Sequence, residues 1–381
     1  MQSIFFYTNA KVYDLTAGIT KKVNSQIKAF EKLGYNVVYS GYIKDGVAIF
    51  NSDGSIITKK TYPIKSNRIQ RIIRRKLLIT FCTDYLKKKK ESFKLIYARY
   101  HFFDSSYLKM LKCAKKVGEY VVIEAHSYPS YEKGLSIMTP VYLTDWLWSK
   151  GAYRYIDFVA AMNNMKEIWK RPTVKISNAV DIDAIPVHNP SVIRKSENEI
   201  HLVSVAFESK AHGLDRIIKG INNYKRMGGE WDFVVHFVGT HLESTKSLAK
   251  FSPYNESFIF YQPLSGKELD EVYDKADIGI GSIANHRVGS YFGSALKTIE
   301  YLAKGIPFIY GWREEIIGDD FPYATRVELN EEPIDMNTIV KLYKETRKEK
   351  DLQQRVRSHL GNDQSWEGQM KKVIDYMNRH K

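Results

Sequence analysis

The chain has 381 residues, 44% of them hydrophobic and 27% charged, which is ordinary for a globular protein and a suitable length for two domains. Its two cysteines and ten histidines show none of the spacings typical of a disulfide scaffold or a metal site, so we expect neither of these, and no metal cofactor. The formal net charge of +15 lies in the first half, where residues 1–183 contain 31 Lys and Arg against 15 Asp and Glu, and this asymmetry indicates an anionic partner for that half.

The first half of the chain alternates between short apolar runs and amphipathic segments. The run at 3–8 suits a buried parallel strand, and the helical spacing of apolar residues after it ends at Gly34, a residue type that favours helix ends. We predict strands at 3–8, 36–40, 93–98, 120–124 and 156–160, and helices at 20–33 and 105–117. This order is typical of a parallel sheet covered by helices.

The same alternation starts again near Ile200. We predict strands at 201–206, 233–238, 258–261, 278–282 and 307–310, and helices at 213–224, 268–275 and 295–304. Two such series predict two doubly wound α/β domains, with ligands bound outside the carboxyl ends of the strands in the cleft between the domains. We place a first domain at 1–183, a second domain at 184–362, and a C-terminal helix at 363–381 that is expected to return to the first domain.

The strongest local signal is the segment 294–307, SALKTIEYLAKGIP, in which a helix begins near Ser294 and closes at Gly305. The free N–H groups at a helix start favour a phosphate. This segment resembles the C-domain motif of the family 4 glycosyltransferases, which include group 1 enzymes of capsule and exopolysaccharide synthesis. The resemblance implies a GT-B fold with two Rossmann-like domains facing a cleft. It assigns ribose binding to Glu300, diphosphate binding to Lys297 and a donor-side position to Ser294.

One position departs from the family pattern. The family usually has a second glutamate eight residues before the position of Glu300, and here that position is Phe292. The missing carboxylate would contact the sugar, so the resemblance leaves the donor sugar and the stereochemistry open. Arg287, beside His286 in the loop before the helix, is a candidate donor-binding residue that could supply polar contacts instead. The alternative is that these two residues are a solvated loop pair.

A second stretch of resemblance, 206–216, follows the first strand of the second domain and opens a helix. Family 4 enzymes carry an arginine and a lysine here that neutralise the donor diphosphate, whose negative charge grows as the nucleotide leaves. The resemblance assigns this role to Lys210, with His212 as a second candidate, while Phe207 stands at the position of the usual arginine. Gly239 ends a strand of the same domain and would let the nucleotide base approach the backbone closely.

The first domain follows the family order as well. Gly18 lies in the first strand–helix loop, where these transferases have a glycine loop near the transferred sugar. Arg99 and Tyr128 follow two of the predicted strands, and we expect them on the acceptor side. His126 ends a strand where the family often places a histidine near the sugar and the acceptor. With Glu124 beside it, it is a candidate catalytic residue; a structural histidine is the alternative.

The resemblance covers almost the whole chain and implies an enzyme that transfers a sugar from a nucleotide-diphosphate donor, in the first place a UDP-sugar, with retention of configuration and without a metal. The acceptor would be a glycan or a lipid-linked glycan of a surface polysaccharide or glycoconjugate. Phe207 and Phe292, at two usually charged positions, leave open an inactive subunit that binds a partner or a substrate. A nucleotide-sugar epimerase of the same fold is a third possibility, which would show turnover without an acceptor.

Residues 59–90 form a strongly basic stretch, with 12 Lys and Arg and a single Asp, ahead of Glu91. Apolar residues and arginines fall on opposite helical faces there: Ile69, Ile72, Ile73 and Leu77 against Arg68, Arg71, Arg74 and Arg75. This pattern is typical of a helix that docks on an anionic bilayer. A packed helix with a solvated basic face is the alternative, and nucleic acid is disfavoured because no recognised module appears. The sequence shows no signal peptide and no 18-residue apolar run, so we expect a cytoplasmic protein, peripheral on the inner face of the membrane if it docks there.

Overall fold

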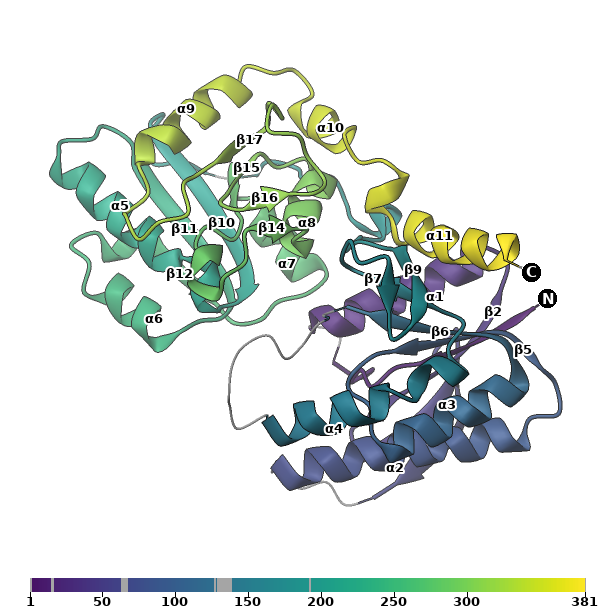
Figure 1. Ribbon diagram of the computed structural model, residues 1–381. Helices are drawn as coiled ribbons and strands as arrows, with labels where there is room; N and C mark the ends of the chain where they lie inside the picture. Colours follow the sequence, from purple (N-terminus) through teal and green to yellow (C-terminus); the bar gives the residue numbers. More distant parts are fainter. Residues whose placement is uncertain are drawn as a thin grey trace. The chain divides into compact units, whose positions relative to one another are not determined.

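The computed structural model describes residues 2–14, 17–62, 68–126, 128, 139–191 and 193–380, without the side chains of 68–71 and 139 (Figure 1). The chain forms two compact units. Unit 1 contains the chain up to Ser177 and the segment from Trp366 onward, and unit 2 contains Asn178–Ser365. The boundaries therefore fall at 177/178 and 365/366, whereas the sequence predicts 183/184 and 362/363.

In the described part of unit 1, nine strands form one sheet in the order β4-β3-β2-β1-β5-β6-β7-β9-β8. The strands are β1 Ser3–Tyr7, β2 Asn36–Ile43, β3 Gly46–Asn51, β4 Ile56–Thr61, β5 Phe93–Arg99, β6 Gly118–Ala125, β7 Phe158–Ala161, β8 Glu167–Ile168 and β9 Arg171–Lys175. The run from β2 to β9 is parallel, and β3, β4 and β8 are antiparallel to their neighbours. All of β5 is buried, which explains the apolar run at residues 95–98.

The hairpins of β2, β3 and β4 are missing from the sequence prediction. β2 continues to Ile43, and the chain then turns back twice at the edge of the sheet. β4 reads IITKKT and is exposed at almost every position. It therefore lacks the alternation of apolar and polar residues that identifies a half-buried strand in a sequence.

Helices cover both faces of this sheet (Figure 1). They are α1 Gly18–Lys32, α2 Arg68–Lys88, α3 Ser105–Val117, α4 Thr139–Ser149, the short 3-10 helix η1 Ala152–Tyr155 and α11 Trp366–Arg379. α1 and α11 pack together on one face, where the ring of Phe30 lies against Phe6 and Tyr97. α2 and α3 pack on the other face and contribute Leu78 and Met110 to the main core of the unit.

In the described part of unit 2, six parallel strands form a sheet in the order β12-β11-β10-β13-β15-β17. They are β10 Glu199–Phe207, β11 Asp232–Thr240, β12 Phe258–Tyr261, β13 Ile278–Ile280, β15 Phe308–Tyr310 and β17 Ala324–Arg326; β14 Phe292–Gly293 pairs separately with β16 Arg313–Glu314. This is the order of doubly wound dinucleotide-binding sheets, and it reverses between β10 and β13. Ligands of such sheets bind at the carboxyl ends of the strands beside the reversal.

The helices of unit 2 flank this sheet. They are α5 Leu214–Arg226, α6 Glu243–Lys250, α7 Lys267–Tyr273, α8 Leu296–Lys304, α9 Met336–Thr346 and α10 Leu352–Arg357. α8 ends at Gly305, as the sequence predicts. The φ of Gly305 is +79°, and a Cβ there would lie 2.3 Å from the Gln353 carbonyl oxygen, so only glycine fits. None of the helices in the described ranges is long and apolar enough to cross a membrane.

Candidate functional site

The loops that follow β10 and β13 pack against each other at the reversal of the unit 2 sheet. The first loop forms the 3-10 helix η3 Lys210–His212, and the second forms η5 Asn285–Val288. The amide of Ala284 donates to the Ala211 carbonyl at 3.0 Å, which fixes one loop to the other. The second loop leads on to β14 and α8, so the motif segments of the sequence come together at this edge of the sheet.

Lys297 lies in the first turn of α8 and is buried, yet its Nζ has no hydrogen-bond partner among the residues that the structure describes. Burial lowers the pKa of this lysine to about 7, although Glu300 and Glu208 act in the opposite direction. The Oγ of Ser294, just before the helix, is also buried without a partner in the same described set. A buried ammonium that makes no hydrogen bond and a hydroxyl at a helix start are groups that a phosphate would satisfy.

His212 lies close to this lysine, whose positive charge, together with burial as the larger cause, lowers the pKa of His212 to about 3. The imidazole is therefore neutral at neutral pH. Its Nδ1 accepts a hydrogen bond from the Ser209 amide at 2.8 Å, so the proton of the neutral ring belongs on Nε2. Lys210 begins the same 3-10 helix and is exposed. The loop thus contains a ring N–H donor on His212 and an exposed ammonium on Lys210.

Glu300 lies one turn after Lys297 on α8, so the two side chains share a face of the helix. It is half-buried and accepts a hydrogen bond from the Tyr273 hydroxyl at 3.3 Å. Gly239, near the end of β11, has a φ of +127°, and a Cβ there would lie 2.0 Å from the Ala206 carbonyl oxygen. The close pairing of β10 and β11 is thus a sufficient reason for a glycine at this position.

Arg287 differs from the expectation that it faces a ligand. Its guanidinium pairs with Asp215 at 2.7 Å and with Glu331 at 2.5 Å, and these hydrogen bonds raise its pKa. His286 also contacts Glu331, at 2.7 Å. The two side chains therefore tie η5 to neighbouring segments of unit 2. The sequence could not indicate this role, because both acidic partners lie more than 40 residues away along the chain.

Two buried carboxylates beside this site are absent from the sequence-based prediction. Glu208 accepts hydrogen bonds from the Leu242 amide at 2.9 Å and the Thr245 hydroxyl at 2.6 Å. Glu314, in β16, accepts from the Thr298 hydroxyl at 2.9 Å and from the Trp312 ring N–H, and its other oxygen is buried without a partner among the described residues. Burial raises the pKa of Glu314 to about 7.

The candidate catalytic residue Glu124 is fully buried in unit 1, at the end of β6. Its carboxylate lies 2.8 Å from the Lys22 ammonium and accepts hydrogen bonds from the amide of Gln26 at 2.7 Å and the hydroxyl of Tyr97 at 3.0 Å. Burial alone would raise its pKa, but the charges of Lys22 and Arg99 outweigh burial and lower the pKa to about 2. Glu124 is thus a buried ion-pair partner that joins α1 to the sheet, and a catalytic role for it stays a prediction.

His126 follows β6 and is half-buried, with a pKa lowered to about 4 by burial and by the charge of Arg99. Its Nδ1 has no hydrogen-bond partner within the described ranges. Arg99 is buried at the end of β5, and Tyr128 packs its ring against Trp169 at 5.1 Å. Gly18 is exposed at the start of α1. These residues all follow strands of unit 1 at its carboxyl edge or begin the helix after one. Ser127 and Pro129 of the same motif lie outside the described residues.

Comparison with known proteins gives structural matches and no sequence matches: neither a family model nor a curated protein matches the chain. The catalytic domain of starch synthase IV from Arabidopsis thaliana, bound to ADP and acarbose, matches with a TM-score of 0.65 over 100% of this chain and 99% of that one, at 10% identity. A glycosyltransferase from Rickettsia africae ESF-5 matches with a TM-score of 0.61 over 99% and 98%, at 13% identity. Anabaena HepE in complex with UDP matches with a TM-score of 0.54 over 100% and 98%, at 12% identity.

Structural similarity at such low sequence identity shows the fold alone. The matches span the full length of both chains, and the two sheets of this chain have the parallel, doubly wound cores that the sequence predicts. The chain therefore has the GT-B fold, with two Rossmann-like units, as the resemblance to family 4 glycosyltransferases implies.

Proposed function

We propose that this protein is a glycosyltransferase that uses a nucleotide-diphosphate sugar, with the donor bound by unit 2. The observation that supports this most is the buried Nζ of Lys297 at the start of α8, which makes no hydrogen bond to any residue that the structure describes. Burying an ammonium without a hydrogen-bond partner is unfavourable, and the folded chain tolerates it where a ligand later supplies the partner. A diphosphate is the anion that the strand-order reversal of a doubly wound sheet typically binds.

The neighbouring residues then take complementary roles. Lys297 and the Nε2–H of His212 donate to the diphosphate, with Lys210 and the Ser294 hydroxyl beside them. Glu300 accepts hydrogen bonds from the ribose hydroxyls, and Gly239 ends β11 next to the nucleotide. As the bond to the sugar breaks, negative charge builds up on the leaving diphosphate, and the fixed donors stabilise it. This charge stabilisation uses only side chains of the protein.

Unit 1 supplies the acceptor side in this proposal. Arg99, His126, Tyr128 and Gly18 lie at its carboxyl edge, and neutral His126 can hold a sugar hydroxyl through a ring nitrogen. We infer a UDP-sugar as donor, retention of configuration, and a glycan or lipid-linked glycan of a surface polysaccharide as acceptor, with the reaction in the cytoplasm. These finer assignments rest on the resemblance of the sequence motifs.

An inactive binding subunit is the second candidate, and two observations favour it. Phe207 and Phe292 are exposed where family 4 enzymes carry charged residues. Glu124 is held in a buried ion pair, so unit 1 offers no half-exposed carboxylate at that position. Such a subunit would bind a nucleotide sugar and would not release the nucleotide.

A nucleotide-release assay separates these candidates. Wild type, Glu300→Gln and the control Glu271→Gln, on the exposed side of α7, are incubated with UDP-, GDP- and ADP-sugars and a pool of glycan acceptors. We expect acceptor-dependent release from one donor class, and a loss of about 10- to 100-fold in kcat/KM for Glu300→Gln alone, because hydrogen bonds to a charged group contribute roughly 1.5–3 kcal/mol. Binding without release would favour the inactive subunit, and turnover without an acceptor would favour an epimerase.

A further inference from the structure

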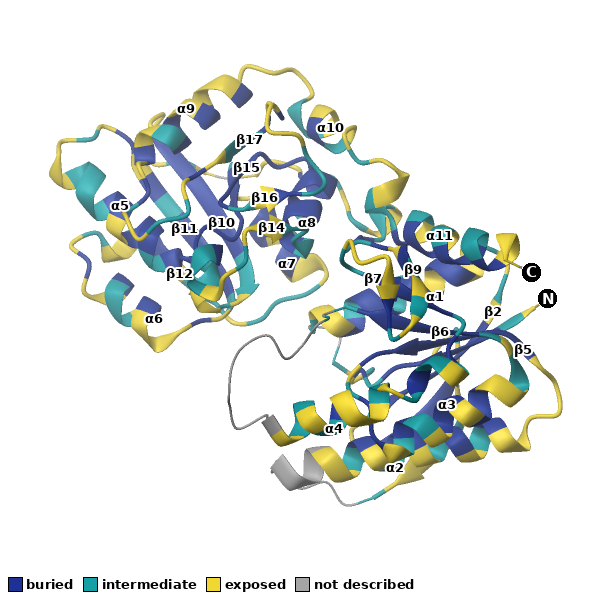
Figure 2. Cartoon of the chain, in the orientation of Figure 1, coloured by how far each residue is buried: buried dark blue, intermediate teal, exposed yellow. Residues whose placement is uncertain are grey.

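The helix α4 buries its acidic side chain and exposes apolar side chains, which is the reverse of the usual pattern for a helix at a protein surface in water. Its acid, Asp145, is buried and accepts hydrogen bonds from the Tyr100 hydroxyl at 2.6 Å and from the Phe103 amide. Leu143, Trp146 and Leu147, at 60%, 50% and 58% exposure, face the solvent. They are spaced i, i+3 and i+4, so they form one continuous apolar strip on α4, a helix with exposed positions along its length in Figure 2.

The start of α2 shows the same inversion. Arg75 is buried, paired with Asp104 and bonded to the Phe102 carbonyl, while Ile72 and Ile73 in the preceding turn are exposed. The side chains of Arg68, Ile69 and Arg71 lie outside the described residues. α2 and α4 are thus both fixed to the segment 100–104, which precedes α3, and both helices belong to the layer on one face of the unit 1 sheet (Figure 1).

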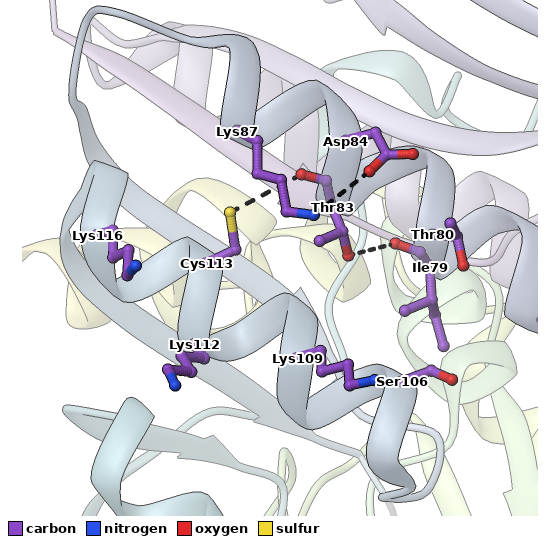
Figure 3. Close-up of a pocket in the computed structure, with 10 residues that line it drawn as sticks. All are labelled: Ile79, Thr80, Thr83, Asp84, Lys87, Ser106, Lys109, Lys112, Cys113 and Lys116. Atoms are coloured by element: carbon purple, nitrogen blue, oxygen red, sulfur yellow. Dashed lines mark hydrogen bonds and ion pairs between the residues drawn. The ribbon is translucent and has the colours of Figure 1, made fainter.

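Lysines lie on α2 and α3 and beside the strip on α4. A groove of about 440 Å³ between α2 and α3 is lined by four lysines, and a single acid, Asp84, lies among the residues that line it (Figure 3). The lysines are Lys87, Lys109, Lys112 and Lys116. At the end of α4, the Lys150 ammonium lies 3.3 Å from the centroid of the exposed Trp146 ring.

We propose that this layer of unit 1 docks on an anionic lipid bilayer. α4 and the start of α2 insert their apolar side chains at the boundary between headgroups and acyl chains, and the lysine groove binds lipid phosphates. Exposed tryptophan and leucine beside lysine are the residues that anchor interfacial helices, because their apolar bodies enter the acyl region while their polar ends stay in the headgroups. A protein partner fits less well, because lysine is depleted from protein–protein interfaces.

This inference goes beyond the proposed sugar transfer and stands whether or not unit 2 is active. It also changes the role of the basic segment. The sequence analysis places the apolar anchor in residues 69–77, and the structure adds α4, for which the sequence predicts no element. The buried positions of Asp145 and Arg75 explain the arrangement, since the two helices pack through polar contacts and leave their apolar residues outside.

The experiment is flotation of the full-length protein with vesicles of phosphatidylcholine alone and with about one third phosphatidylglycerol. The variants are Leu143→Ser/Leu147→Ser for the apolar strip, Lys109→Glu/Lys112→Glu for the groove, and Phe251→Ser as a matched control at an exposed apolar residue of unit 2. We expect wild type and control to float with anionic vesicles only. Each double variant should lose about tenfold or more in partitioning, since burying one leucine is equivalent to roughly a tenfold change in affinity.

Folding and self-association are checked in the same samples. Circular dichroism and the thermal shift caused by UDP report whether each variant is folded and whether unit 2 binds its ligand, independently of the vesicles. Equal flotation of all four proteins, or no flotation of the wild type with anionic vesicles, would overturn the proposal. A concentration-dependent dimer in light scattering that Leu143→Ser/Leu147→Ser abolishes would also overturn it, because it would assign the apolar strip to a second copy of the chain.

Discussion

Replacing Lys297 by methionine should stabilise the free protein and remove its response to nucleotide. The ammonium is buried without a hydrogen-bond partner in the described part of the chain, and burial lowers its pKa from 10.5 to about 7. At 1.36 kcal/mol for each pH unit between the unfolded and folded pKa values, the charged lysine destabilises the folded state by about 4 kcal/mol at pH 7. Methionine has nearly the same length and carries no charge, so the variant avoids most of this penalty.

The sign of the pH dependence gives a second readout from the same variant. Because the folded pKa lies below the unfolded pKa, the penalty is largest below pH 7 and disappears as the pH rises toward 10.5. We expect urea unfolding to give Lys297→Met a higher midpoint than wild type at pH 7, with an unchanged slope. The difference in free energy of unfolding should fall to about 1 kcal/mol at pH 9.5.

The control is Lys267→Met on α7, where the ammonium is exposed and only loosely paired with Glu271. This variant should unfold like the wild type at both pH values, and UDP should stabilise it as it stabilises the wild type. If Lys297→Met is less stable than wild type at pH 7, or if its gain does not depend on pH, then the lysine is compensated in the free protein and the reasoning about the site is wrong.

Three further changes test individual contacts by urea or thermal unfolding. Glu314→Gln should be more stable than wild type by about 3 kcal/mol above pH 7 and equal to it below pH 4.5, because burial raises the pKa of the carboxyl to about 7 and its ionisation then disfavours the folded state; a constant difference across this range would contradict that assignment. Glu124→Gln should destabilise unit 1 by about 3–5 kcal/mol at pH 7, because it leaves the Lys22 ammonium buried without a counter-charge; unchanged stability would show that water reaches the lysine. Gly239→Ala should destabilise unit 2 by about 2 kcal/mol or more, because φ is +127° and the new Cβ would meet the Ala206 carbonyl; a neutral effect would mean that the end of β11 can relax.

The sequence predicts the fold well where the signal is local. Buried parallel strands contain short apolar runs, as at residues 95–98 of β5, and the end of α8 is marked by a glycine that no other residue can replace. The sequence does not predict the edge hairpins, because β4 is exposed and its composition resembles that of a loop. The sequence does not predict α4 either, because its apolar residues face outward and their spacing does not correspond to packing against a core.

The roles of single side chains depend on partners that are distant in the sequence, and the sequence alone does not identify these partners. Arg287 reads as a free cation in a loop, yet Asp215 and Glu331 engage it. Glu124 reads as a carboxylate beside a histidine, yet Lys22 of α1 buries it in an ion pair. In contrast, the candidate site at the start of α8 follows from one continuous segment and the strand order, and there the structure places Lys297 close to Glu300 and His212.

The most direct test of the donor site is calorimetric titration of UDP into wild type and Lys297→Met at pH 8, in two buffers with different heats of ionisation. In the protein without ligand, Lys297 has a pKa of about 7 and is mostly neutral at this pH. A bound diphosphate should therefore cause the lysine to take up about 0.9 proton per UDP. We predict this proton uptake for the wild type, and weaker binding without uptake for the variant. Equal binding by both proteins without proton uptake, or no binding of UDP, ADP or GDP by the wild type, would contradict the assignment of unit 2 as the donor-binding unit.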